Sequence, residues 1–268
     1  SIGYFSIKGG YFTLLSGGAF RVWGPPDSFI ENNNSLAVAT LMIIPIMVYF
    51  YKIYKNNKWI KFLMAFSIIG SFFSVIGSQS RGAFLAIIAV LVFFWLKSKN
   101  KLVSGLAIAI FGIVALSFMP ETWFNRMNTI ETYEEDSSAM GRINAWEYSI
   151  NVANDRVLGI GLDSWSLETF AMYAPNPLDV HAAHSIYFAV VANHGWIGLF
   201  LYLLIFFMAW AVLASNIKET NKQDEFFELN LLSRMFQVGF IAYFFGGAFL
   251  SMSYYDLPWH MVSMVVII

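Results

Sequence analysis

The chain has 268 residues, of which 58% are hydrophobic and only 12% are charged, and its formal net charge is −1. Because soluble domains carry about 25% charged residues, this composition excludes an ordinary soluble protein and indicates a polytopic α-helical membrane protein. The near-zero charge provides no general attraction to nucleic acid. The chain has no cysteine, which excludes thiolate metal sites, a catalytic cysteine and disulfides.

Long apolar runs predict six transmembrane helices and the start of a seventh. The six runs cover residues 35–51, 59–77, 83–96, 102–119, 196–214 and 235–251, and the seventh starts near residue 258. Residue 1 is Ser, and residue 268 lies inside an apolar run. We therefore expect a piece of a longer protein, with residues 1–268 in a single membrane domain.

The basic residues differ between the two sides of these predicted helices. If the helices alternate in direction, ten of the 16 basic residues fall on one side, and nine of those ten are Lys. The positive-inside rule makes that side cytoplasmic. Five of the other six are Arg, namely Arg21, Arg81, Arg126, Arg142 and Arg156. Because arginines outside oppose the topology rule, we expect them to serve another purpose.

The predicted periplasmic side has three pieces: residues 1–34, a short turn at 78–82 and a large loop at 120–183. Within the large loop, residues 138–154 have apolar side chains at steps of three and four, which predicts an amphipathic helix. Residues 184–213 would form a helix of about 45 Å, against roughly 30 Å of hydrocarbon. We therefore expect a break at Asn193-His194-Gly195, with the membrane span starting at Trp196.

Two arginines on this side are candidates for binding an anion. Arg142 is expected in the first turn of the amphipathic helix, where the helix dipole also favours an anion, and Trp146 could hold its guanidinium by stacking. Arg81 is the only charge in the turn between two spans. A phosphate-binding role is favoured for Arg81, and for Arg142 it is balanced against pairing with acidic residues or lipid headgroups.

His184 is a candidate proton acceptor, because a helix start disfavours the imidazolium form and imidazole commonly transfers protons near neutral pH. A purely structural histidine is the alternative. His181 and His184 have the spacing of metal ligands, but zinc would need a third ligand from Asp163 or Asp179, and we expect no metal. Any of several outer acids, including Glu31, Asp163 and Asp179, could assist the histidine.

The order of these motifs is similar to that of a known family. His184-Ser185, followed by Gly195 and Gly198, resembles the histidine motif of the O-antigen ligase and polymerase superfamily. Gly141 to Trp146 resembles its periplasmic arginine motif, with Trp146 where the family has Leu, and Ser80 to Ala83 resembles a second arginine motif. Three further stretches resemble the branch called exosortase A-associated putative O-glycosylation ligase: residues 8–10, residues 21–33 including Arg21 and Glu31, and residues 181–187.

The resemblance implies a GT-C-like membrane glycosyltransferase of about a dozen spans, of which this chain holds six or seven, in the bacterial inner membrane. Such an enzyme moves a glycan from undecaprenyl diphosphate to an acceptor hydroxyl on a lipid, glycan or protein at the periplasmic face, without metal or cofactor. The resemblance implies that His184 is the general base, that Arg142 and Arg81 bind the diphosphate, and that Arg21, Glu31, Asp163, Asp179 and Trp146 support them.

Two other functions remain open. A polymerase of the same superfamily would use the same groups with a growing glycan as acceptor. A solute transporter would normally carry ionisable side chains or broken helices at mid-membrane, and the predicted spans carry almost no interior charge.

Overall fold

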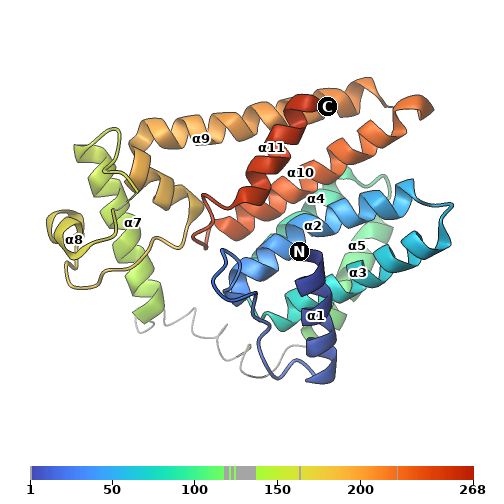
Figure 1. Cartoon of the computed structure of the whole chain (residues 1–268), viewed down its shortest axis with the longest axis horizontal. Coiled ribbons are helices and arrows are strands. Elements are labelled where there is room, and N and C mark those ends of the chain that lie inside the picture. The colour runs from blue at the N-terminus through green and yellow to red at the C-terminus, as the bar shows by residue number, and fades with distance from the viewer. Residues whose placement is uncertain (1, 118–120, 122–123, 125–136, 163, 222) are drawn as a thin grey trace. The chain divides into compact units, whose positions relative to one another are not determined.

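The computed structural model describes residues 2–117, 121, 124, 137–162, 164–221 and 223–268 (Figure 1). These residues form helices, turns and loops without any β-strand, which confirms the all-α class. The elements in chain order are α1 (Ile2–Leu15), α2 (Asn33–Ile53), α3 (Lys58–Gly77), α4 (Arg81–Lys97), α5 (Lys101–Ser117), α7 (Ser137–Asp155), α8 (Leu167–Tyr173), α9 (Ile186–Glu219), the 3-10 helix η2 (Asp224–Phe226), α10 (Phe227–Gly247) and α11 (Asp256–Ile267).

Among the described residues, three helices are long and apolar enough to cross a membrane, namely α2, α3 and α9. Helices α4 and α5 have 17 residues each and α11 has 12, so they are apolar but shorter. Helix α10 has 21 residues and includes Glu228 and Arg234. Each apolar run of the sequence falls on one of these helices, which supports a polytopic α-helical membrane protein.

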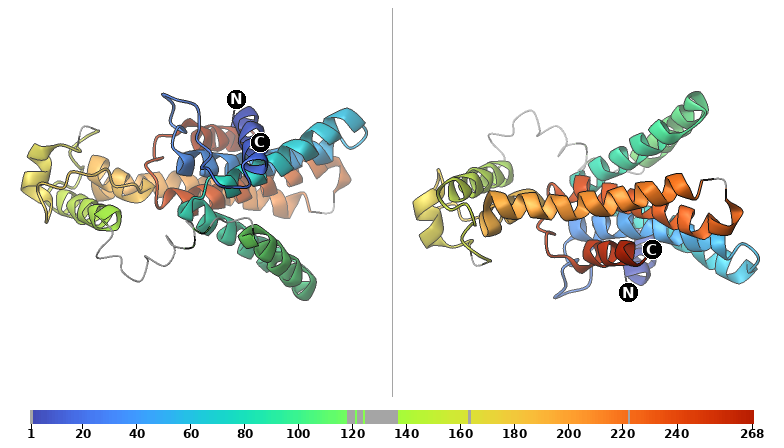
Figure 2. Two further views of the ribbon diagram at one scale, coloured as in Figure 1. Left: turned by 90° about the horizontal axis from the view of Figure 1, so that it is seen from below. Right: turned by 90° about the horizontal axis from the view of Figure 1, so that it is seen from above.

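The chain divides into two compact units. The first comprises Ser1–Phe124, Trp210–Gly246 and Asp256–Ile268, and the second comprises Asn125–Ala209 and Gly247–Tyr255. In the first unit, α4 and α5 form a helical hairpin, which can be followed in Figure 2. That residues 1–268 form one membrane domain stays a prediction.

Helix α1 lies within residues 1–34, where the sequence analysis expected no helix. It packs on α3 through glycines: a Cβ on Gly10 would lie 2.0 Å from Gly70 O, and one on Gly9 would lie 2.4 Å from Ser74 Oγ. Glycine therefore allows the two backbones to approach more closely than any side chain would permit. Glycine lowers helix propensity, so the reason for this helix lies in its tertiary packing.

The turn between α3 and α4 is held by the N-terminal segment. Asn33 Nδ2 donates to Ser78 O at 2.7 Å, and Gln79 Nε2 donates to Gly18 O at 2.9 Å. The Val22 amide donates to Gly77 O at 3.0 Å. Two of the three pieces that the sequence placed on one side therefore meet at the same end of this unit, although their location in the periplasm stays a prediction.

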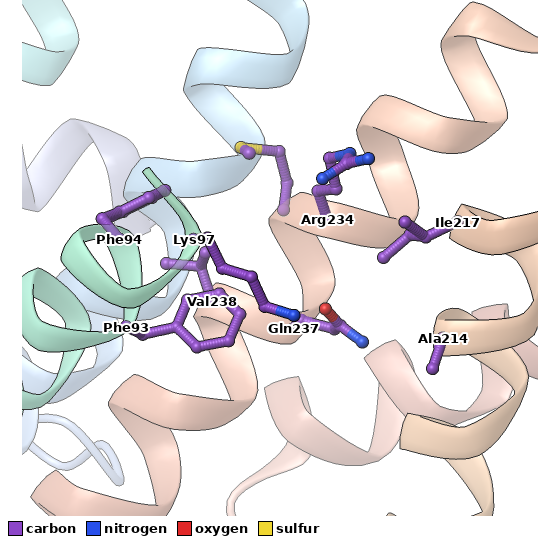
Figure 3. Close-up of a pocket in the computed structure, with 9 residues that line it drawn as sticks. Phe93, Phe94, Lys97, Ala214, Ile217, Arg234, Gln237 and Val238 are labelled. Carbon is purple, nitrogen blue, oxygen red and sulfur yellow. The ribbon is translucent and has the colours of Figure 1, made fainter. Parts of the chain in front are cut away.

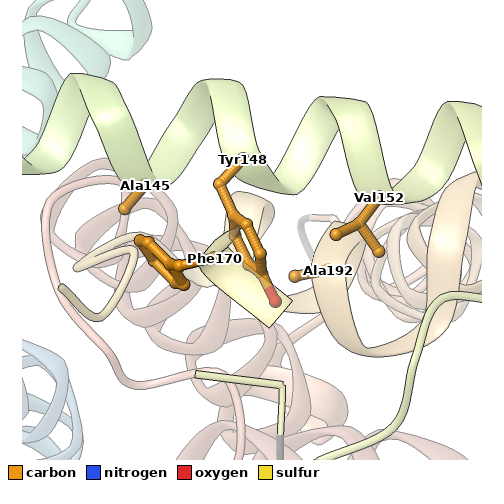
Figure 4. Packing of buried hydrophobic residues seen from close by; sticks show 5 residues of the cluster. All are labelled: Ala145, Tyr148, Val152, Phe170 and Ala192. Carbon is orange, nitrogen blue, oxygen red and sulfur yellow. The ribbon is translucent and has the colours of Figure 1, made fainter. Parts of the chain in front are cut away.

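The core of the second unit forms where the amphipathic helix packs on its neighbours. Figure 4 shows Ala145, Tyr148 and Val152 of α7 against Phe170 of α8 and Ala192 of α9, and all five are buried. The rings of Tyr148 and Phe170 stack with their centroids 4.1 Å apart. The Tyr148 hydroxyl also donates to Ser164 O, which anchors the loop before α8. The predicted amphipathic helix is thus confirmed, with one more residue at each end.

Helix α9 is broken at Gly195, where the sequence predicted the break (Figure 1). Gly195 has φ 66° and ψ −168°, a combination that essentially only glycine adopts. The loop after α7 supplies donors at this point: the Ile160 amide bonds to Ala192 O at 3.1 Å and the Gly161 amide to Asn193 O at 3.0 Å. These bonds satisfy two carbonyls that the break would otherwise leave without partners.

A Gly195→Ala substitution should destabilise this protein. A Cβ there would meet Val157 O at 1.8 Å, and the backbone conformation itself costs about 1–3 kcal/mol for other residues. We expect a lower thermal unfolding temperature in detergent. Gly112→Ala in α5 is the control, because a Cβ there meets nothing within 4 Å, and it should leave the unfolding temperature unchanged or slightly raised. Equal effects of the two changes would refute the role given to Gly195.

Candidate active site

His184 lies immediately before the start of α9, in the second unit. Its backbone adopts φ 44°, a left-handed conformation that is uncommon outside glycine and often marks functional positions. The half-buried imidazole has its Nδ1 3.5 Å from Ser251 Oγ. Ser253 Oγ donates to Ile186 O at 3.1 Å, so the segment after α10 packs on the start of α9 and fixes the surroundings of His184.

The environment of His184 favours the neutral imidazole. Burial lowers the pKa of His184 below the ordinary value of 6.5, and electrostatic interactions with Arg142 and, to a smaller extent, with His181 lower this pKa further. The sequence analysis predicted a neutral imidazole from the helix dipole, whereas burial is the largest cause in the structure. A neutral histidine has a ring nitrogen free to accept a proton.

Arg142 is the sixth residue of α7, so it lies beyond the first turn in which it was expected. The prediction of the first turn was wrong, because the unpaired N–H groups of a helix are confined to its first four residues. Arg142 lies beyond them whether the helix begins at residue 138, as expected, or at Ser137, as observed. Arg142 is half-buried, and its charge acts on His184 rather than adding to an exposed helix terminus.

Trp146 holds the chain segment that leads to His184. Its indole Nε1 donates to Ala183 O at 2.8 Å, and its ring stacks on Phe188 with centroids 4.9 Å apart and planes at 11°. The expected stacking of Trp146 on the Arg142 guanidinium stays a prediction. Trp146 therefore links α7 to Ala183 and Phe188, which lie on either side of His184 in the chain.

His181 is paired with an acid and pressed against α7. Its Nδ1 lies 2.5 Å from Asp179 Oδ1, and a Cβ on Gly141 would come within 2.9 Å of its ring. Any assistance from Asp179 to His184 would therefore run through His181. No three His, Asp or Glu side chains among the described residues come together as a metal site, and Asp163, the other proposed third ligand, lies outside them.

Asn144 fixes the loop that carries Asp179. Its side-chain amide donates to Asn176 O at 3.0 Å and to Asp179 O at 2.9 Å, while its Oδ1 accepts from the Asn176 amide at 2.8 Å. Because this buried side chain both donates and accepts hydrogen bonds, it fits only one arrangement of the backbone groups around it. The sequence analysis missed this role, because the spacing of 32 and 35 residues between the partners leaves no local signal.

A second polar network lies at the break of α9. Asn193 accepts from Ser164 Oγ at 2.6 Å and donates to Tyr254 OH at 2.8 Å. Tyr254 OH also lies 3.0 Å from His194 Nε2. This network joins the loop before α8, the break and the segment after α10. It supports a structural role for His194.

Arg81, Arg21 and Glu31 belong to the first unit. Arg81 is the first residue of α4, directly after Ser80, whose Oγ accepts from the Ala83 amide at 3.1 Å. The cation at a helix start that was predicted at Arg142 is therefore found at Arg81. Arg21 is half-buried next to Val22, and exposed Glu31 accepts from the Asp27 amide at 3.1 Å. That these residues join His184 and Arg142 in one site stays a prediction.

The remaining outer arginines differ in their surroundings. Arg156 is exposed, with its Nε 3.3 Å from Tyr173 OH and 3.9 Å from Asp155 Oδ2. It is thus paired at the surface of the second unit. Arg126 and the acidic stretch 131–136 lie outside the described residues.

Comparison with known proteins gives one match. A family model described as O-Antigen ligase matches residues 66–203, just over half of the chain. The matched segment includes Arg81, Arg142 and His184 and excludes Arg21 and Glu31. No curated protein and no solved structure matches the chain.

Removing the charge of Arg142 should raise the pKa of His184. An Arg142→Gln variant loses the second-largest cause of the lowered pKa but keeps the largest, burial, so the pKa should rise yet stay below 6.5. Titration of isotope-labelled histidine by NMR would measure this change. Arg156→Gln removes an exposed, surface-paired arginine and should leave the titration of His184 unchanged. A His184 pKa that is the same in both variants and the wild type would contradict the interpretation.

Proposed function

We propose a reaction for this chain, which belongs to the O-antigen ligase family. It transfers a glycan from undecaprenyl diphosphate to an acceptor hydroxyl at the periplasmic face of the bacterial inner membrane. The family match supports a membrane enzyme that ligates or polymerises glycans. The exosortase A-associated branch stays a prediction.

The observation that carries the proposal is the neutral, half-buried His184 beside the positive charge of Arg142. An acceptor hydroxyl attacks well only if its proton has a place to go, and a neutral imidazole can take it. If Nδ1–H points to Ser251 Oγ, Nε2 is the nitrogen that accepts the proton. The new bond forms between the acceptor oxygen and the anomeric carbon, while the bond from that carbon to the diphosphate oxygen breaks.

Arg142 would have two effects in this reaction. Its guanidinium stabilises the negative charge that develops on the departing undecaprenyl diphosphate. Before the donor binds, the same charge lowers the pKa of His184. A bound diphosphate would offset that charge, so His184 would become a stronger base when the donor is in place.

Supporting roles follow from the contacts of the neighbouring residues. Trp146 and the Asp179–His181 pair hold the segment on which His184 lies. Arg81, at the start of α4, is proposed as a second diphosphate ligand, with Arg21 and Glu31 supporting it at the same end of their unit. Asp163 stays a candidate. The proposed reaction needs neither metal nor cofactor, because the two arginines supply the positive charge.

A polymerase would use the same donor groups with a growing glycan as acceptor, so product analysis separates the two reactions. A transporter is disfavoured because the three helices of spanning length carry their charges near their ends, namely Lys52, Lys58, Lys61, Lys218 and Glu219. Incubation of the full-length protein with lipid-linked glycan and candidate acceptors tests the proposal.

The base role predicts a large loss of turnover in His184→Ala. General-base assistance typically contributes 10²–10⁴-fold, so turnover should fall by that order while donor binding is nearly unchanged. His184→Gln should not rescue, since an amide is not basic. In the wild type, the rate should fall as the pH drops through the lowered pKa of His184, because protonation removes the base. Transfer kinetics and donor binding measure these effects.

Two matched histidine variants control this experiment. His181→Ala and His194→Ala each remove a nearby imidazole, one paired with Asp179 and one with Tyr254, and should be milder. Near-normal turnover in His184→Ala would show that another group is the base. A loss of donor binding in place of turnover would make His184 a diphosphate ligand.

The diphosphate role predicts that Arg142→Ala lowers the transfer rate by about 10²–10³, the typical effect of removing a donor that acts in the transition state. Arg81→Ala should behave similarly. Lys at either position keeps the charge but loses the bidentate guanidinium, so it should rescue only in part. Arg156→Ala is the control and should be close to wild type, because Arg156 is exposed and paired at the surface. Wild-type transfer by folded Arg142→Ala would exclude the role.

A further inference from the structure

A pocket in the first unit lies between three helices and contains two basic side chains. It has a volume of about 190 Å³ and is formed by α4, α9 and α10 (Figure 3). Lys97 belongs to the last turn of α4, and Ile217 belongs to the last turn of α9. The lining residues are Phe93, Phe94, Lys97, Ala214, Ile217, Arg234, Met235, Gln237 and Val238.

The polar part of this pocket is positively charged. It contains Lys97 and Arg234 together with the amide of Gln237, and none of the described lining residues is acidic. The Lys97 amine lies 5.7 Å from the centre of the Phe93 ring. Arg234 Nε donates to Asn230 Oδ1 at 2.7 Å, which orients the guanidinium without neutralising it. Two cations at one pocket favour an anionic ligand.

The position of Arg234 in α10 also favours an anionic ligand. It is the eighth residue of α10, about 10 Å along the helix from Phe227 at 1.5 Å per residue, and Met235 and Val238 beside it are apolar. Arg234 directly precedes the apolar run 235–251, so we expect it where the helix enters the membrane, and a cation at that level is stabilised by an anionic partner. The phosphate of a lipid headgroup lies at this level of a membrane and could supply that charge.

The walls of the pocket indicate an amphipathic ligand. Phe93, Phe94, Ala214, Ile217 and Val238 are apolar, whereas a site for a small soluble anion would surround it with polar donors. Basic pockets between transmembrane helices on the cytoplasmic side are suited to anionic lipid headgroups. The charge distribution predicts that Lys97, Lys218 and Arg234 lie on the cytoplasmic side.

We propose that this pocket binds an anionic phospholipid of the cytoplasmic leaflet, with the headgroup phosphate between Lys97 and Arg234 and the start of an acyl chain along the apolar wall. The site is separate from the residues proposed for glycan transfer. Its occupation would tie α4, whose first residue is Arg81, to the C-terminal part of α9 and to α10 within the first unit.

The test is retention of lipid by the purified full-length protein, measured by native mass spectrometry after reconstitution with phosphatidylglycerol or phosphatidylcholine. The wild type should retain phosphatidylglycerol preferentially. Each of Lys97→Gln and Arg234→Gln should lower this retention about fivefold, and the double variant by more than tenfold. Lys61→Gln is the matched control: the Lys61 amine also lies over an aromatic ring, 5.2 Å from the centre of Tyr51, but Lys61 does not line the pocket.

Three results would overturn the proposal. One is equal retention of the two lipids by the wild type, a comparison that needs no folded variant. Another is a loss in Lys61→Gln as large as in the double variant. The third is displacement of phosphatidylglycerol by excess inorganic phosphate, together with phosphate binding in the absence of lipid, which would make a soluble anion the ligand. Retained preference in Lys97→Arg and Arg234→Lys, which keep the charges, would support the proposal.

Discussion

Two backbone hydrogen bonds, from the Ile160 and Gly161 amides to the carbonyls of Ala192 and Asn193, connect the large loop to the helix that carries the candidate base. They exist because α9 is broken at Gly195, which exposes carbonyls that an unbroken helix would have paired internally. A break beside a membrane is tolerated only where such groups find partners. The loop supplies these partners, so the same two hydrogen bonds pair the carbonyls at the break and attach the loop to α9.

Side chains extend this attachment from the break to His184. Asn193, Ser164 and Tyr254 bond at one end of the first segment of α9, and Trp146 and Phe188 stack at the other. The buried ring of Tyr148 lies between α7, α8 and α9 in the core of the unit. His184 therefore rests on a segment that is fixed by backbone, polar and aromatic contacts together. A base needs this fixed position, because proton transfer depends on distance and direction.

The charges of the chain suit two different phosphate ligands. On the proposed periplasmic side, arginine predominates, and its planar guanidinium can bind both oxygens of a diphosphate and remain charged in a half-buried site. At the other ends of α4, α9 and α10, Lys97 and Arg234 face a pocket with apolar walls. The same physical rule, that a buried or membrane-level cation needs an anion, is the basis of both proposed sites.

The sequence by itself determined the all-α membrane class, the extent of the amphipathic helix and the break at Gly195. It also singled out Arg81, Arg142 and His184, whose roles stay a prediction. Each of these depends on local spacing: apolar runs, steps of three and four residues, an Asn-His-Gly triplet or short motifs. The family match to residues 66–203 agrees with the motif order.

The helix in residues 2–15 was not predicted, because its stability comes from glycine contacts with α3 rather than from its own propensity. Only the tertiary structure decided that burial is the main cause of the lowered pKa of His184, that Asp179 pairs with His181, and that Trp146 stacks on Phe188. The pKa depends on solvent exclusion by the fold, Trp146 and Phe188 are 42 positions apart, and Asn144 holds the backbone of Asp179 from 35 positions away. None of these leaves a trace in local sequence spacing.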